Sequence, residues 1–312
     1  MKTNSALILL VFQLLMICPA LGQQLPVYSH YSLSPFLINP ANAGIFNYGE
    51  LQSNIRYQWV GMDDAPKTIV LSGNMPIQQK NVGVGGYLFN DRTGPLSRTG
   101  MSLAYAYHLE LPKSLLLSFG IFGGIIQYRI DGNQIFLADE EERILFDGIE
   151  STFVPDASLG IRLEGDRWYA GLALNHLLHN KIKSKPSGNA ENSYGTLEYH
   201  AFIMGGYLLP INKNFEMTPS VLIKVLPNNI MQVDVSAKLS YQHKFWGGVS
   251  YRSADILSVL AGYDFNEKLY AGYAYDLTTK GLKNYSAGSH ELVLGYRLIN
   301  DHTKKETRRT LD

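Results

Sequence analysis

The sequence predicts an all-β fold, a transmembrane antiparallel up-and-down β-barrel of about 14 strands. The prediction depends on three observations: recurrent alternation of apolar and polar residues, segments of about ten residues, and connections that are alternately short and long. Ten residues are the length of a tilted membrane strand, whereas strands of soluble domains most often have five or six. We therefore favour a membrane barrel over a soluble β-sandwich, which alternation alone also allows.

Residues 1–22 have the features of a cleaved export signal. Lys2 provides a positive start, residues 6–17 are almost continuously apolar, and a small-residue cleavage site ends at Gly22. The apolar run is shorter than the roughly 20 residues of a spanning helix, although an uncleaved anchor is the alternative. Cleavage there would remove Cys18, the single cysteine, and would exclude disulfides and cysteine-ligated metals in the mature chain.

Composition and continuity indicate one barrel without a linker. The formal net charge is zero, which gives no basic excess for binding nucleic acid, and the 20 tyrosines and 29 glycines suit strands, membrane interfaces and tight turns. We expect four regions: a signal peptide (1–22), an N-terminal periplasmic segment (23–47), the barrel (48–299) and a polar C-terminal tail (300–312).

The alternation predicts which side of each strand faces lipid. In residues 233–241 valine, alanine, leucine and tyrosine alternate with polar side chains. An arginine on the lipid face at mid-membrane costs about 2–4 kcal/mol, so the polar faces, with Arg56, Lys238 and Arg297, should line the lumen. We expect strands near 48–60, 67–76, 81–90, 97–110, 114–130, 153–164, 166–176, 197–209, 213–225, 230–243, 245–253, 255–265, 267–277 and 289–299.

The connections between these strands predict the orientation of the barrel. The even-numbered connections are all short, whereas the longest ones, residues 131–152, 177–196 and 278–288, are all odd-numbered. Bacterial barrels have short periplasmic turns and long extracellular loops. The odd-numbered connections should therefore be extracellular, and the protein should lie in the outer membrane.

We find no motif that predicts catalysis, a cofactor or a metal site. The acidic block 139–142 is a contiguous run rather than the spaced oxygens of a calcium loop, so we favour a solvated loop, with protein docking open. His176, His179 and His200 suit polar rim residues better than a metal site. The run 289–291 resembles part of a Ser-His-acid set, but adjacent strand residues point to opposite faces. We predict a non-enzymatic protein without cofactors.

Four irregular segments are not explained by barrel alternation. They are Ser34-Pro-Phe-Leu-Ile-Asn-Pro-Ala-Asn-Ala-Gly44 (preceded by Tyr28-Ser-His-Tyr31), Gln58-Trp-Val-Gly-Met-Asp-Asp-Ala-Pro-Lys-Thr68, Asn90-Asp-Arg-Thr-Gly-Pro-Leu-Ser-Arg-Thr-Gly100 and Asn284-Tyr-Ser-Ala-Gly-Ser-His-Glu291. In this order and spacing they resemble the PorP/SprF family of the Bacteroidota type IX secretion system. The resemblance covers essentially the whole mature chain.

The resemblance implies an outer-membrane barrel that serves secretion or surface attachment of a cargo protein with a C-terminal sorting domain, of gliding or adhesin type. It also implies periplasmic partners from the secretion system. Asn42 stands where the family usually has Tyr, and family barrels commonly end soon after the last strand, whereas this chain continues to Asp312. An outer-membrane solute channel or hydrophobic-compound transporter is the alternative, and a lipid hydrolase is a distant third.

Turn-forming residues in these segments predict two roles. Asn39, Pro40 and Gly44 would fold the N-terminal segment across or into the barrel base, where it could plug the lumen. Gly and Pro in the outer loops would give the rim a fixed shape suited to docking a protein. We expect cargo docking to involve Trp59, Asp63, Asp64, Asp91 and Arg92, and a structural role for Asn39, Pro40, Gly44, Gly94, Pro95, His290 and Glu291.

Overall fold

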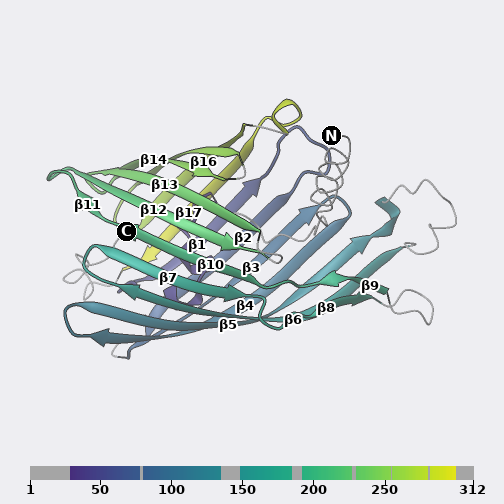
Figure 1. Ribbon diagram of the computed structural model, residues 1–312, viewed down its shortest axis with the longest axis horizontal. Coiled ribbons are helices and arrows are strands. Elements are labelled where there is room, and N and C mark those ends of the chain that lie inside the picture. The colour runs from purple at the N-terminus through teal and green to yellow at the C-terminus, as the bar shows by residue number, and fades with distance from the viewer. Residues whose placement is uncertain are drawn as a thin grey trace, which may run out of the picture.

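The computed structural model describes residues 29–77, 80–134, 148–184, 192–226, 230–253, 255–279 and 282–299. They form a closed antiparallel β-barrel of 14 strands, which confirms the predicted fold class (Figure 1). The expected signal peptide and C-terminal tail lie outside the described residues. The barrel strands are β1 (Gly49–Tyr57), β2 (Lys67–Ile77), β3 (Val82–Thr93), β4 (Leu96–Leu111), β5 (Leu115–Asp131), β6 (Ile149–Glu164), β7 (Trp168–Asn175), β10 (His200–Tyr207), β12 (Phe215–Val225), β13 (Met231–Tyr241), β14 (Phe245–Arg252), β15 (Ile256–Asp264), β16 (Leu269–Thr278) and β17 (Ser289–Leu298).

The barrel closes where its first and last strands meet. β1 pairs with β17 over nine residues, from Gly49 opposite Leu298 to Tyr57 opposite His290. On the far side β10 pairs with both β7 and β12, so a short strand, β11 (Leu209–Pro210), is only an extension of β12. Each barrel strand therefore has two antiparallel partners, and no main-chain edge of the barrel wall is left open.

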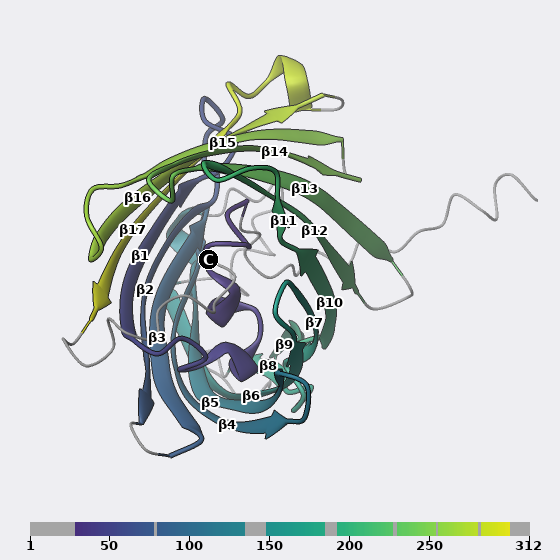
Figure 2. The ribbon, with the colours of Figure 1, turned by 90° about the vertical axis from the view of Figure 1, so that its left-hand side faces the viewer.

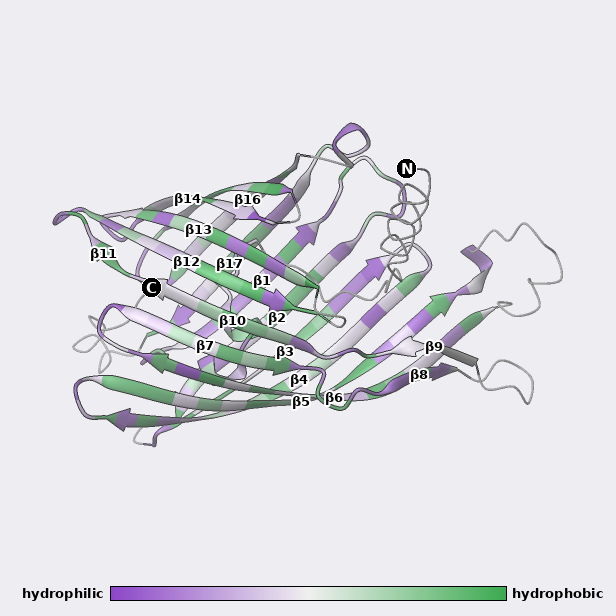
Figure 3. Cartoon of the chain, in the orientation of Figure 1, coloured by the Kyte–Doolittle hydropathy of each residue, from purple (hydrophilic) through white to green (hydrophobic). Residues whose placement is uncertain are grey.

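The two faces of the wall differ as the alternation predicted. Large apolar side chains are exposed on the outside, among them Leu71 at 54 %, Leu103 at 64 % and Phe153 at 63 %, and hydropathy alternates along the strands (Figure 3). Arg56, by contrast, is buried in the lumen at 3 % exposure. Apolar exposure of this kind on every barrel strand except β12 suits a protein whose outer solvent is lipid.

The connections also separate by end. Those after β2, β4, β6, β10, β13 and β15 have at most seven residues, and the long ones follow β5, β7 and β16 at the opposite end. We call these ends periplasmic and extracellular, following the barrel rule. No helix within the described ranges is long and apolar enough to cross a membrane.

One of the long connections contains two further strands. Residues 177–196, expected to be an extracellular connection, include a two-stranded hairpin of β8 (Lys181–Ser184) and β9 (Asn192–Thr196). Ile182 of β8 and Leu197, which follows β9, are buried against Tyr128 and Val154 of the wall. This contact gives the hairpin an apolar face to bury, which an isolated two-stranded hairpin lacks. The acidic block 139–142 lies outside the described residues.

Candidate functional site in the lumen and at the outer rim

The lumen is filled by residues 29–46, which we call the plug. Figure 2 looks along the barrel and shows this purple segment, with its short helical turns, inside the ring of strands. The turns are 3-10 helices η1 (Pro35–Leu37) and η2 (Pro40–Asn42). The plug was expected at the periplasmic base, and Gly44 does lie there, beside Gly83. It also reaches the extracellular half, where Ser29 contacts Arg56.

The periplasmic part of the plug fits the wall by shape. A Cβ on Gly120 would lie 2.3 Å from the backbone nitrogen of Ala41, and one on Gly160 would lie 1.9 Å from Oδ1 of Asn39. These wall glycines, like Gly83, therefore provide room for the plug to approach the strand backbone. At Gly83 a Cβ would lie 1.8 Å from the backbone oxygen of Ala43.

The side chain of Asn39 fixes both the shape and the position of the Asn-Pro turn. Its side chain accepts a hydrogen bond from the backbone of Ala41 at 2.9 Å, which caps η2, and Pro40 needs no donor at that position. Its amide group also donates to the backbone carbonyls of Ile161 (3.1 Å) and Leu172 (3.2 Å) in the wall. One side chain thus shapes the turn and attaches it to β6 and β7.

Asn42, which departs from the family motif, has a definite role here. Its amide donates to the backbone carbonyl of Pro35 at 2.8 Å, and its Oδ1 accepts from the guanidinium of Arg162 at 3.0 Å. Arg162 also pairs with Glu164 at 2.8 Å and lies 4.3 Å from the ring centre of Tyr169. The residue therefore joins the two helical turns to a charged group of the lumen.

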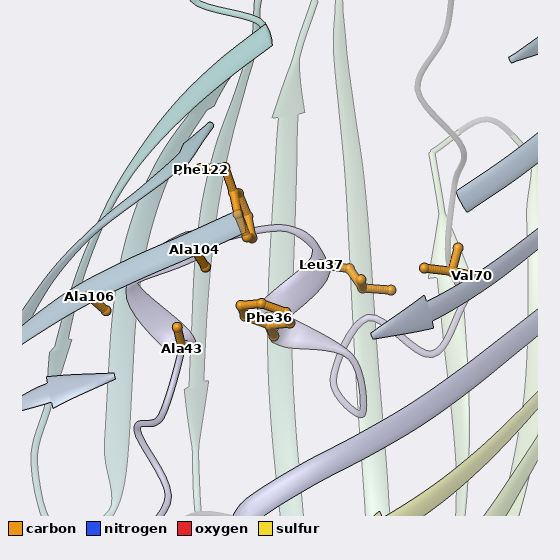
Figure 4. Packing of buried hydrophobic residues seen from close by; sticks show 7 residues of the cluster. All are labelled: Phe36, Leu37, Ala43, Val70, Ala104, Ala106 and Phe122. Atoms are coloured by element: carbon orange, nitrogen blue, oxygen red, sulfur yellow. The ribbon is translucent and has the colours of Figure 1, made fainter. Parts of the chain in front are cut away.

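An apolar cluster holds the middle of the plug. Phe36 packs edge-on against Phe122 with ring centres 5.3 Å apart (Figure 4). Burial of a side chain of this size stabilises a contact by about 1.5–3 kcal/mol. The cluster consists of Phe36, Leu37 and Ala43 from the plug and Val70, Ala104, Ala106 and Phe122 from β2, β4 and β5.

The extracellular end of the plug is held by charge. Arg56 pairs with Asp276 at 2.6 Å and with Glu291 at 2.9 Å, and all three are almost completely buried. The backbone nitrogens of Ser29 and His30 donate to Glu291 at 2.7 and 3.2 Å. Hydrogen bonds to ionised groups are among the stronger ones in proteins. Glu291, expected only to be structural, is therefore the main anchor for the start of the plug.

Two titratable side chains of the plug are affected by burial. Burial lowers the pKa of His30, whose ring packs edge-on against Trp246 at 5.6 Å and whose two nitrogens have no hydrogen-bond partner. Burial raises the pKa of Tyr31 to about 12, and its hydroxyl exchanges hydrogen bonds with Ser220 (3.0 Å) and Ser236 (2.8 Å). Both side chains are therefore neutral near pH 7.

His290, which precedes Glu291 in β17, faces the outside of the barrel. His290 points outward and its ring contacts the hydroxyl of Tyr273 at 2.5 Å, whereas Ser289 and Glu291 are buried on the lumen side. As expected from strand geometry, the three side chains of the run 289–291 do not converge.

The outer rim brings three of the sequence segments together. The backbone of Gly94 donates to the carbonyl of Asp64 at 3.1 Å, and Val60 exchanges backbone hydrogen bonds with Gly288 (2.8 Å) and Ala287 (2.7 Å). Trp59 adopts a φ of 50°, a left-handed conformation that is rare for a bulky residue. Such a backbone persists only where its surroundings hold it, so the loop contacts indicate a rim of fixed shape.

Four of the five residues expected to dock cargo lie at this rim. Asp63, Asp64 and Arg92 are exposed and Trp59 is half-buried. Asp91 is the exception: it is 5 % exposed, accepts a hydrogen bond from Thr68 at 2.6 Å and pairs with Arg98 in the lumen wall. The parity of the strand could have indicated this, because Asp91 is two residues from the inward-facing Phe89. Of the structural residues, Gly94 and Pro95 form the turn of this rim.

The three histidines do not form a common rim group. His176 and His200 are buried at 5 % and 2 %, with ring centres 5.9 Å apart, and His176 pairs with Asp156 at 2.9 Å. His179 is exposed and lies 3.5 Å from Glu198. Within the described residues no group of three or more His, Cys, Asp or Glu side chains is arranged to hold a metal ion.

Comparison with a solved structure indicates the same fold. The chain is similar to the CymD monoaromatic hydrocarbon channel, with 12 % identity, coverage of 89 % of this chain and 94 % of that one, and a TM-score of 0.50. It is also similar to the toluene transporter TodX of Pseudomonas putida (9 % identity, 88 % and 94 % coverage, TM-score 0.49) and to the translocator domain of the autotransporter NalP of Neisseria meningitidis (11 %, 87 % and 96 %, 0.48). No curated protein matches the sequence.

A protein-family comparison is more specific. The model of the type IX secretion system membrane protein PorP/SprF matches residues 20–296. This range includes the plug, all 14 barrel strands up to Tyr296 of β17, and the outer rim. The chain therefore belongs to the PorP/SprF family of type IX secretion system membrane proteins, and it is an outer-membrane β-barrel.

Proposed function

We propose that this protein is a non-enzymatic component that serves secretion or surface attachment of a cargo protein with a C-terminal sorting domain. The observation that carries the proposal is the filled lumen: the plug is attached to the wall by shape at Asn39 and by charge at Glu291. A barrel filled in this way is suited to present a surface rather than to pass large solutes. The family membership supplies the secretion system in which that surface would act.

We assign cargo docking to the outer rim. Asp63, Asp64 and Arg92 offer exposed charges of both signs, and Trp59 offers an amphipathic ring beside them. Aromatic and arginine side chains are enriched among residues that dominate protein interfaces. Because the three loop segments are hydrogen-bonded to one another, a partner would meet a preformed surface and lose less entropy on binding.

Surface retention of cargo tests this assignment. Replacing Asp63, Asp64 and Arg92 together with alanine should leave the barrel in the outer membrane and reduce the amount of cargo on the cell surface several-fold. The matched control is Lys213→Ala, an exposed residue at the periplasmic end. Unchanged retention in the triple variant would contradict docking at this rim.

Partner isolation and conductance separate this function from a solute channel. A secretion or anchoring component should co-purify from the outer membrane with a protein that has a sorting domain, identified by mass spectrometry. In a planar bilayer it should show little conductance, because the plug occupies the lumen. Steady conductance without any dependence on a cargo protein would favour the channel alternative.

A further inference from the structure

A cavity of ≈ 80 Å³ lies in the extracellular half of the lumen, between the plug and the wall. Leu37 and Ile38 of the plug form one side of it. Ile126 and Tyr128 form another, and they also pack with Ile182 of β8. A single water needs only about 10–15 Å³ measured in this way, so the cavity has room for a small organic group.

Three polar groups that line this cavity have no partner. Oδ1 of Asp156 and Oδ1 of Asn175 are buried without a hydrogen bond. Lys224 is only 5 % exposed. Within the described ranges its side chain makes neither a hydrogen bond nor an ion pair, and it lines the same cavity. Burying a polar group without a partner costs about 1–3 kcal/mol, more for a charged one. Two buried acceptors without a donor, and a cation beside them, therefore point to a molecule bound in this cavity.

The remaining charges of the cavity are already paired. Asp234 accepts from Arg252 at 2.9 Å and from Gln232 at 3.2 Å, and Arg98 pairs with Asp91. The other oxygen of Asp156 bonds His176 at 2.9 Å. The groups of the cavity that still lack a partner are one positive group, Lys224, and two hydrogen-bond acceptors, Asp156 and Asn175. A simple anion would satisfy only Lys224, and a simple amine only the acceptors.

We propose that this cavity binds a free amino acid with an apolar side chain. Its carboxylate accepts from Lys224, and its ammonium group donates to Asp156 and Asn175. Its side chain contacts the apolar lining, which includes Leu37, Ile38, Phe202 and Leu222. Because the plug closes the periplasmic side, the molecule enters from the extracellular end.

Binding of matched probes to the full-length barrel in lipid nanodiscs tests the proposal by calorimetry. The probes are L-leucine, leucyl-leucine, 4-methylpentanoate and 3-methylbutylamine, the last two being leucine without its ammonium or its carboxylate. We expect L-leucine to bind at least tenfold more tightly than both truncated probes and than leucyl-leucine, whose ammonium and carboxylate are on different residues. Absence of L-leucine binding, or equal binding by any of the other three probes, would overturn the proposal.

Variants locate the site. Lys224→Met and Asp156→Asn should each weaken binding of L-leucine at least tenfold. Lys238→Met, a lumen-facing residue of the adjacent β13 that does not line the cavity, should leave it unchanged. Equal affinity in all three variants would place the molecule elsewhere. The probe series needs no variant, so a folding defect in one of them leaves the proposal testable.

Discussion

The two ends of the plug are attached to the same barrel by different physical means. At the extracellular end, Ser29 and His30 bind carboxylates that are held by Arg56, so the attachment depends on charge. At the periplasmic end, residues 39–44 lie against wall glycines that leave no room for a Cβ, so the attachment depends on shape. The charged attachment depends on pH, whereas the fit to backbone does not. As pH falls, the plug should therefore loosen from its extracellular end first.

The largest effect should come from filling the space at the shape-fitted end. In Gly120→Val the added Cβ would lie 2.3 Å from the backbone of Pro40 and Ala41. Overpacking against movable side chains typically costs about 1–3 kcal/mol, and we expect a larger cost here, above that of breaking the buried ion pair, because backbone cannot yield as a side chain does. We expect residues 39–44 to lose hydrogen-exchange protection and the barrel to conduct in a planar bilayer.

Gly123→Val is the control for this substitution. It lies in the same strand, β5, and a Cβ there meets nothing within 4 Å. Equal exchange protection in the two variants would show that the plug is not held by its fit to Gly120.

The next largest effect should come from breaking the charged end. Arg56→Met leaves Asp276 and Glu291 buried beside each other without their cation, and breaking a buried pair costs about 3–5 kcal/mol. Exchange protection should fall at residues 29–33 and persist at 39–44. Arg129→Met, at an exposed position of β5, is the control. Loss of protection along the whole plug would mean that its two ends are not independent.

A smaller effect is expected from the hydroxyl of Tyr31. Tyr31→Phe removes hydrogen bonds to Ser220 and Ser236 but retains the ring, and should weaken the plug attachment by about 1 kcal/mol. The two serines still bond each other at 2.8 Å, which limits the cost. A change in exchange protection of residues 29–33 as large as that of Arg56→Met would contradict this ranking.

The smallest effect should be that of pH on the charged end. Burial lowers the pKa of His30 in the plugged state, so the released segment binds a proton more readily. Attachment is therefore complete above the ordinary histidine pKa of about 6.5 and is lost as pH falls below it. Only part of the released population is protonated between pH 7.5 and 6, which keeps the effect small. Protection of residues 29–33 should decrease across this range in the parent and stay level in His30→Phe.

The strand pattern was predictable because it is local. Alternation over ten residues is enough to assign the lumen face of Arg56, and loop lengths are enough to orient the barrel. How far the plug reaches into the lumen was not predictable from the sequence. Ser29 and Glu291 are 262 residues apart, and neither segment has a pattern that indicates contact with the other. Hairpin β8–β9 was missed for a related reason: its apolar contacts, such as that with Val154, exist only once the wall is formed.

The closure of the barrel by β1 and β17 has a consequence for the order of assembly. The carboxylate that holds Ser29 belongs to β17, which follows all the other described barrel strands in the chain. The plug, which precedes these strands, therefore stays unattached at that end until β17 has been inserted. Closure of the barrel and attachment of the plug therefore become one event, and only the complete barrel holds the plug at its extracellular end.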